Sequence, residues 1–241
     1  MEWELKPARD HELSPREKLA SLKREGGLAS LVSQWCWRRA VGLYLRLFHR
    51  LSVSGAENLP APPFVLVANH NSHLDILALT AALPARYLER VHPIAAEDHF
   101  FASFAGSLFA AMAINALPLK RKAARGKDLA LLRERLVEEG LIYVLFPEGT
   151  RSRDGRMAPF KAGIGALLAQ GHVAIVPCYL DGAFAALPPQ RLWPRPVKLR
   201  LAIGKPIGVA DCANDRDGWI EVGARCEKEV GQLGERQIAS R

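Results

Sequence analysis

The sequence has little cysteine, and what it has is scattered. Cys36, Cys178, Cys212 and Cys226 form no Cys-x-x-Cys pair and show no zinc-like spacing with histidine. We therefore expect no disulfide and no structural metal, and a reduced, cytosolic compartment is the simpler interpretation.

The sequence also lacks a recognisable secretory signal and a clean membrane-spanning run. Acids and bases alternate at the amino terminus before any apolar segment, and no small-residue cleavage site follows a short apolar core, so we expect no secretory signal. The longest uncharged run, 100–119, has the length of a spanning helix, about 20 residues. Because Gly106, Asn115 and Pro118 interrupt it, we expect a buried helix followed by a buried strand, with a membrane-embedded helix as the alternative.

Acidic residues are too few to balance the basic ones. Lys and Arg total 33 against 25 Asp and Glu, which gives a net charge of +8 and suits an anionic partner: nucleic acid, anionic lipid or a phosphorylated substrate. The composition is otherwise that of a globular protein, 49% hydrophobic and 24% charged. One domain with a substantial core is therefore expected over residues 51–241.

Residues 1–50 have a different composition and are predicted to form a helical segment. Ser14 to Glu17 match a capping box with proline at the first helical position. Residues 28–51 combine apolar side chains and tryptophans with arginines, and Arg39 and Arg46 fall on the helical face of Leu28 and Trp35. We therefore expect two short amphipathic pieces, or a helix bent near residues 38–39.

Apolar helices edged with tryptophan and arginine are typical of segments that lie in a membrane interface. We expect residues 1–50 to be such a segment, peripheral or monotopic on the cytoplasmic face of a membrane. The alternative is a helix packed on its own domain with its arginines in water.

The remainder alternates between strand and helix patterns, which predicts an α/β fold with a mostly parallel mixed sheet flanked by helices. The expected strands are 64–68, 92–96, 114–119, 141–146, 173–180 and 197–203. The expected helices are 74–83, 98–112, 128–139, 162–170 and 218–233.

The stretch from Asn69 to Asp75 follows the first of these strands and precedes a helix. In open α/β proteins the carboxyl edge of the sheet is where sites are built. Residues five apart on one helix point away from each other, so His70 can meet Asp75 only if His70 lies in the turn. A carboxylate on one ring nitrogen would leave the other free to take a proton.

Three other places on the chain carry charge at comparable positions. The run from Phe146 to Ser152 follows a strand, and Thr150 and Arg151 there offer hydroxyl, guanidinium and backbone donors suited to a phosphate. Arg121 ends another strand, and Lys161 stands just before a helix.

Together, in this order, these blocks resemble the glycerolipid acyltransferase family. The blocks are Asn-His-x-x-x-x-Asp at 69–75, Arg121, Phe-Pro-Glu-Gly-Thr-Arg-Ser at 146–152, and Val176-Pro177 after a strand. The resemblance covers about residues 50–210, so that 51–241 would be the acyltransferase domain. It is greatest to the members that acylate lysophosphatidic acid.

The resemblance implies transfer of a fatty acyl group to the free hydroxyl of a lysophospholipid, with lysophosphatidic acid giving phosphatidic acid. His70 would be the general base and Asp75 its orienting partner. The donor would be acyl-coenzyme A or acyl carrier protein, with no acyl-enzyme and no cofactor. The expected acceptor site consists of Arg121, Glu148, Gly149, Thr150, Arg151 and Lys161, with the arginines on the phosphate and Glu148 orienting Arg151 or a glycerol hydroxyl.

Three alternatives stay open. Lys120 before Arg121 departs from the family pattern, so the acceptor could be another lyso-lipid, for example a lyso-aminolipid. His70, His73 and Asp75 could suggest a metal hydrolase, but Ile76 stands where a further histidine ligand is needed, and His73 is more consistent with packing. A non-catalytic lipid-binding protein would not need His70 oriented by Asp75, and the absence of arginines aligned with stacking aromatics argues against nucleic acid.

Overall fold

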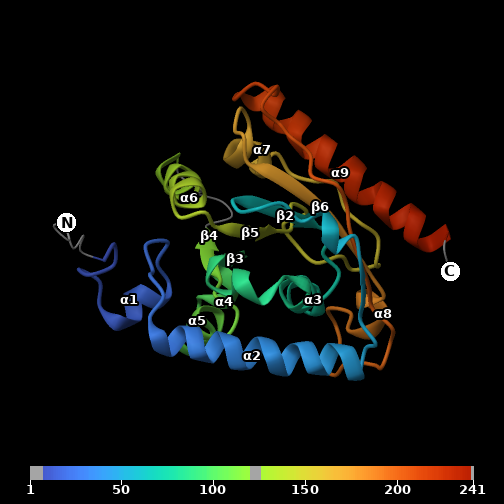
Figure 1. The fold of residues 1–241 in the computed structure, drawn as a ribbon, viewed down its shortest axis with the longest axis horizontal. Coiled ribbons are helices and arrows are strands. Elements are labelled where there is room, and N and C mark those ends of the chain that lie inside the picture. Colours follow the sequence, from blue (N-terminus) through green and yellow to red (C-terminus); the bar gives the residue numbers. More distant parts are fainter. Residues whose placement is uncertain (1–7, 120–125, 240–241) are drawn as a thin grey trace.

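The computed structural model describes residues 8–119 and 126–239, which form helices around one seven-stranded sheet (Figure 1). The strands lie in the order β1-β7-β6-β2-β5-β3-β4. Their bounds are β1 Ser52–Ser54, β2 Phe64–Ala68, β3 Val91–Ala96, β4 Leu117–Leu119, β5 Ile142–Leu145, β6 Ala174–Asp181 and β7 Arg200–Ile203. Among these strands β6 and β7 are the one antiparallel pair, so the predicted mostly parallel mixed sheet is confirmed.

Helices cover both faces of the sheet. The α-helices are α1 Pro15–Leu19, α2 Leu28–Leu47, α3 Leu74–Ala82, α4 Glu97–Phe100, α5 Phe104–Met112, α6 Gly126–Glu138, α7 Gly163–Leu168, α8 Ala183–Ala186 and α9 Arg216–Ala239, with 3-10 turns η1 Ala56–Asn58 and η2 Ala85–Arg90. In Figure 1, α2, α3, α5 and α8 lie on one side, and α6, α7 and α9 on the other.

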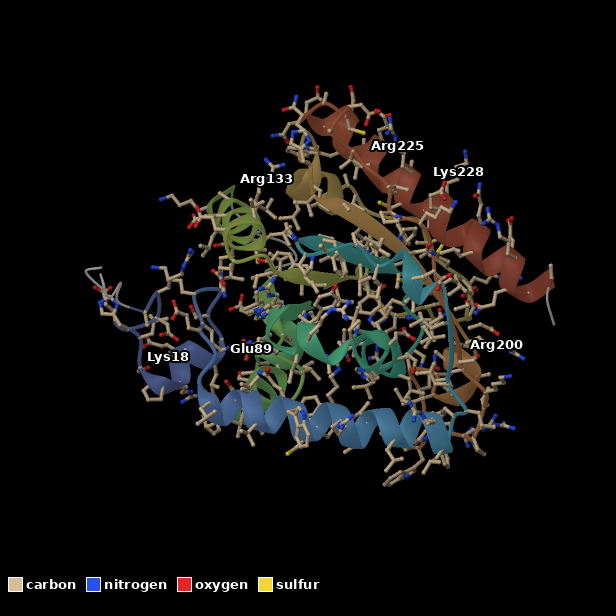
Figure 2. All side chains as sticks on the ribbon, viewed as in Figure 1. Lys18, Glu89, Arg133, Arg200, Arg225 and Lys228 are labelled. Atoms are coloured by element: carbon tan, nitrogen blue, oxygen red, sulfur yellow. The ribbon has the colours of Figure 1, made fainter. Side chains whose placement is uncertain are left out.

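Strand β2 shows why the two largest hydrophobic cores lie on opposite faces of the sheet. All five of its residues are buried, because side chains from the helices on both sides cover both of its faces (Figure 2). Phe64, Leu66 and Ala68 join the core beneath α2 and α3, while Val65 and Val67 join the core beneath α6, α7 and α9. The central strand is therefore held from both sides, and the turn that follows it starts from a fixed point.

Several predicted elements are confirmed, with changes at their boundaries. The Ser14 capping box is present on α1. The helix expected over 98–112 is instead two helices, α4 and α5, because Ser103 caps the start of α5 with its side chain. Strand β1 was not predicted because it is three residues long, polar and exposed.

Of the two alternatives predicted for residues 28–51, two short pieces is wrong, because α2 runs as one helix from Leu28 to Leu47. Its inward side contributes Val41 and Leu45 to the core, while Leu28 and Leu43 are exposed on another side. Apolar residues therefore occupy two sides of α2, and a helical projection that assumes one apolar face does not describe this helix.

The run 100–119 contains α5 and β4, as expected. Ala110 and Leu117 are buried, but Phe104, Leu108 and Phe109 are exposed, so α5 is not the fully buried helix that was predicted. Within residues 8–119 and 126–239, no helix is both long and apolar enough to cross a membrane.

Candidate active site

The site forms where β2 and β5 end side by side. These strands are parallel and in register, with Val67 opposite Leu145, so both chains leave the sheet at the same edge. The turn that carries His70 follows β2, and the loop from Phe146 to Ser152 follows β5. Sequence segments about 80 residues apart are thus brought together by strand pairing.

His70 and Asp75 make the predicted contact. Asp75 lies in the first turn of α3, and its Oδ2 is 3.0 Å from Nδ1 of His70. The Asp75 side chain is fully buried, whereas the His70 side chain is 20% exposed and lines a cavity. With Nδ1 directed at the carboxylate, Nε2 is the ring nitrogen left for chemistry in that cavity.

Backbone donors fix the position of the Asp75 carboxylate. Its Oδ2 also accepts the N–H groups of Asn71, at 2.6 Å, and Ser72, at 2.8 Å. The hydroxyl of Ser72 accepts the N–H of Leu74 at 3.1 Å, which closes the same turn at the start of α3. The carboxylate is therefore held by the turn whose histidine it orients.

Glu148 is buried behind His70 and binds backbone. Its Oε1 accepts the N–H of His70 at 2.6 Å, and its Oε2 accepts the N–H of Ala158 at 2.8 Å. Burial raises the pKa of the Glu148 carboxyl, while the N–H groups of Ala158 and His70 act to lower that pKa. Both carboxylate oxygens are thus used to hold the loops, which differs from the predicted contact with Arg151 or a glycerol hydroxyl.

Two further contacts join the His70 turn to the loop after β5. The N–H of Ser152 donates to the carbonyl of His70 at 2.8 Å. The Phe146 ring stacks on the His70 ring, with centroids 4.1 Å apart and planes 16° apart. Phe146 thus covers one face of the imidazole, while Glu148 and Ser152 hold the backbone of His70 in place.

Asn69 fixes the end of β2, a role that sequence reasoning missed. Its Nδ2 donates to the carbonyl of Leu180 at 3.1 Å, and its Oδ1 accepts the N–H of Leu180 at 2.8 Å. The side chain thus ties β2 to β6 immediately before His70. The signal in the sequence was a polar residue that directly continues an apolar strand.

A cavity of about 840 Å³ lies in front of His70. This is within the range of small-molecule sites, about 300–1,000 Å³. Its charged lining includes Arg151, Arg153 and Asp98. Its apolar lining includes Ile76, Ile94, Ile114, Leu119, Leu145 and Phe146.

Only some of the predicted binding residues line the cavity. Gly149, Thr150 and Arg151 line the cavity, whereas Lys161 lies against Gly149 and is absent from the lining. Gly149 has φ +75°, a left-handed backbone conformation that favours glycine, and the Nζ of Lys161 lies 2.6 Å from where a Cβ would stand. Arg121 lies outside the described residues, and the prediction for it stays a prediction.

Arg153 and Asp98 line the cavity although the sequence did not single them out. Arg153 stands two residues after Arg151, and this alternation could have indicated a second cation in the same loop. Val176 and Pro177 lie inside β6 and not after it.

The metal-hydrolase alternative would require several ligand side chains close together. In residues 8–119 and 126–239, no three His, Cys, Asp or Glu side chains gather closely enough to hold a metal ion. His73 lines the cavity, but its side chain is exposed at the junction with α3.

A family model described as Acyltransferase matches residues 50–181, which is more than half of the chain. The chain belongs to the Acyltransferase family. The match contains His70, Asp75, Glu148 and Arg151, so the resemblance drawn from the sequence blocks is confirmed at the level of the family.

Relatives and a solved structure agree with this assignment. A chloroplastic 1-acyl-sn-glycerol-3-phosphate acyltransferase, BAT2 of Brassica napus, is 37% identical over 144 residues, 58% of this chain and 40% of the relative. The human 1-acyl-sn-glycerol-3-phosphate acyltransferase alpha is 34% identical over 133 residues, 55% of this chain and 46% of the relative. The chain thus spans less than half the length of either.

The fold is that of a solved member of the same group. The crystal structure of the 1-acyl-sn-glycerophosphate acyltransferase PlsC from Thermotoga maritima superposes with a TM-score of 0.63 at 23% identity. The likeness covers 86% of this chain and 79% of that one. This family member therefore shares the PlsC fold around its sheet.

Proposed function

We propose that this protein transfers a fatty acyl group from a thioester to the free hydroxyl of a lysophospholipid, with lysophosphatidic acid as the acceptor. The observation that carries the proposal is the position of His70, held by Asp75 on the wall of a cavity that Arg151 and Arg153 also line. The family and the names of its relatives support the same reaction class.

The chemistry follows from the free ring nitrogen. Nε2 of His70 takes the proton of the acceptor hydroxyl as that oxygen attacks the thioester carbonyl carbon. The carbon–sulfur bond then breaks, and the imidazolium returns the proton to the leaving thiolate. Asp75 stabilises the imidazolium between these steps, and a base so placed contributes about 10² to 10⁴ in rate.

The two kinds of cavity lining suit the two parts of such an acceptor. Arginine binds phosphate through two parallel hydrogen bonds, so Arg151 and Arg153 are suited to the head group. The apolar residues from α3, β3, β4 and β5 are suited to an acyl chain. The donor is acyl-coenzyme A or acyl carrier protein.

The test is acyl transfer by the purified full chain from acyl-coenzyme A and from acyl carrier protein to a panel of acceptors. The panel contains lysophosphatidic acid, its phosphate-free analogue monoacylglycerol, lysophosphatidylcholine and a lyso-aminolipid. We expect phosphatidic acid to be the main product and monoacylglycerol to be a poor acceptor. Preference for the lyso-aminolipid would reassign the acceptor, and the absence of transfer to any acceptor would reject the proposed function.

We also propose that α2 lies on a membrane surface. Its outward residues include Leu28, Val32, Trp35, Leu43 and Leu47, which are 51–78% exposed, and the exposed arginines Arg39 and Arg46. This composition is typical of an interfacial helix. Because Val41 and Leu45 belong to the core, the test is serine substitution of Val32 and Leu43 rather than deletion of the helix. Unchanged vesicle binding would reject this assignment.

A further inference from the structure

The two most exposed large apolar side chains of the described residues lie next to each other on a loop that the proposed reaction does not use. Leu192 is 89% exposed and Trp193 is 80% exposed. They lie between α8 and β7, outside both cores. Moving such a side chain out of water stabilises a protein or a complex by about 1.5–3 kcal/mol. Leu192 and Trp193 do not contribute this free energy to folding, so it is available for binding.

The loop that carries them is fixed in shape. The N–H of Arg191 donates to the carbonyl of Pro188 at 3.0 Å, and the N–H of Arg195 donates to the carbonyl of Ala186 at 2.8 Å. Four prolines restrict the backbone further: Pro188, Pro189, Pro194 and Pro196. Leu192 and Trp193 are therefore presented at a bend with little conformational freedom left to lose on binding.

The loop lies between the cavity and α2. At one end, Pro189 and Gln190 line the cavity. At the other end, the guanidinium of Arg50 donates to the carbonyl of Pro196 at 3.3 Å, just after the carboxyl end of α2. Leu192 follows the cavity-lining Gln190 by two residues, so the exposed apolar pair belongs to the loop that borders the cavity.

Charge indicates which partner fits this surface. Arg191 and Arg195, both exposed, flank Leu192 and Trp193. Tryptophan beside arginine is typical of the membrane–water interface, and arginines near an anionic leaflet each add about 1 kcal/mol of attraction. Two apolar residues are too few for a stable protein interface, which buries roughly 1,200–2,000 Å². An anionic phospholipid bilayer fits both the size and the charge.

We infer that the loop 188–196 inserts Leu192 and Trp193 into an anionic phospholipid bilayer and so seats the mouth of the cavity on the membrane that holds the acceptor. The role of the membrane as the source of acceptor rests on the proposed function. The insertion itself does not, since it follows from exposure, charge and position. This contact is separate from that of α2 and orients the cavity, whereas one helix alone would allow rotation about its axis.

Insertion is tested on the full chain with a fluorescent probe. Cys36 is the exposed cysteine, so Cys36→Ser leaves the buried thiols of Cys178, Cys212 and Cys226 and allows one new label. An environment-sensitive dye is attached at Leu192→Cys or, as control, at Ile220→Cys, which is 53% exposed on α9 at the other side of the sheet. Vesicles of phosphatidylcholine with and without phosphatidylglycerol are then added.

We expect the dye at position 192 to shift to the blue and to be quenched by lipids with nitroxide-labelled chains, more strongly with phosphatidylglycerol. The dye at position 220 should not respond. No response at 192, equal responses at both positions, or a shift at 192 on raising protein concentration without vesicles would overturn the proposal, the last in favour of a second copy as the occupant.

A second variant pair separates this inference from the proposed function. Leu192→Ser with Trp193→Ser should weaken vesicle binding roughly tenfold or more, while Ile220→Ser with Ile238→Ser should not. The ratio of turnover with vesicle-borne to short-chain soluble lysophosphatidic acid should fall by a similar factor in the loop variant. Normal vesicle binding by the loop variant overturns the inference. Vesicle binding without any acyl transfer by the wild type rejects only the proposed function.

Discussion

The two sides of the cavity are built differently. On one side, His70 and Asp75 are tied to backbone groups and to Glu148, and both carboxylates are buried. On the other, Arg153 is exposed and Arg151 is half-buried. Proton transfer requires a fixed geometry, whereas exposed arginine side chains can adjust their position to bind a phosphate. Under the proposed function, we expect the first side to set the rate and the second side to set the choice of acceptor.

The largest effect is expected for His70→Ala. Loss of the base should lower kcat for acyl transfer by about 10² to 10⁴. His73→Ala is the matched control, since His73 lines the same cavity without the contact to Asp75, and it should keep most of its activity. The activity of both variants is measured by detecting the free thiol that is released when the thioester donor is cleaved. Comparable losses in the two variants would show that the histidines are not distinguished by Asp75.

Glu148→Gln tests whether the fixed side depends on its buried carboxylate. Glutamine can accept only one of the two N–H bonds, so the free energy of unfolding should fall by about 1–3 kcal/mol and kcat by up to ~10²-fold. Glu227→Gln is the control, because Glu227 accepts the N–H of Phe160 at 2.8 Å outside the cavity lining. Because glutamine can still accept the one N–H bond that Glu227 accepts, thermal melts and steady-state kinetics should show loss of stability and of kcat in Glu148→Gln and little change in Glu227→Gln.

Arg151→Lys tests the exposed side. Lysine keeps the charge but loses the two parallel bonds, so KM for lysophosphatidic acid should rise roughly tenfold while kcat changes little. Arg156→Lys is the control, because Arg156 is exposed in the same loop and is absent from the cavity lining. A fall in kcat with unchanged KM would mean that Arg151 acts in the chemical step and not in binding of the acceptor.

The smallest effect concerns the titration of two carboxyls on one loop. Burial raises the pKa of Glu148, whereas the N–H of Arg156 and the Ser152 hydroxyl lower the pKa of exposed Asp154. Stability should therefore fall as pH rises through the Glu148 pKa, because the folded state binds that proton more tightly, and rise as Asp154 ionises. Carbon-detected NMR titration checks both directions. A Glu148 pKa at or below its ordinary range would mean that the N–H groups of Ala158 and His70 outweigh the effect of burial.

Much of the fold was predictable because its signals are local. The buried strand 64–68 and the capping box at Ser14 depend on apolar runs and cap residues, and both are present. The uninterrupted α2 was not predicted, because its apolar residues lie on two sides of the helix: Leu45 is buried in the core, whereas Leu43 is exposed. Strand β1 lacked any apolar signal.

The same distinction applies to the site. The spacing of His70 and Asp75 allowed their contact only if His70 lay in the turn, and the structure shows His70 there with the contact made. The use of Glu148 did not, because its partners His70 and Ala158 are brought to it by the pairing of β2 with β5 and by the return of the loop. Membership of the cavity wall is likewise a property of the folded chain, and this is why Arg153 was missed and Lys161 was included.

In the proposed mechanism Asp75 acts through His70, and a double-mutant cycle measures this coupling. kcat is measured for Asp75→Asn, for His70→Ala and for the double variant, with thermal melts to confirm folding. If the two residues act as one unit, the double variant is no slower than His70→Ala alone. Losses that multiply would contradict this account and give Asp75 a role independent of the imidazole.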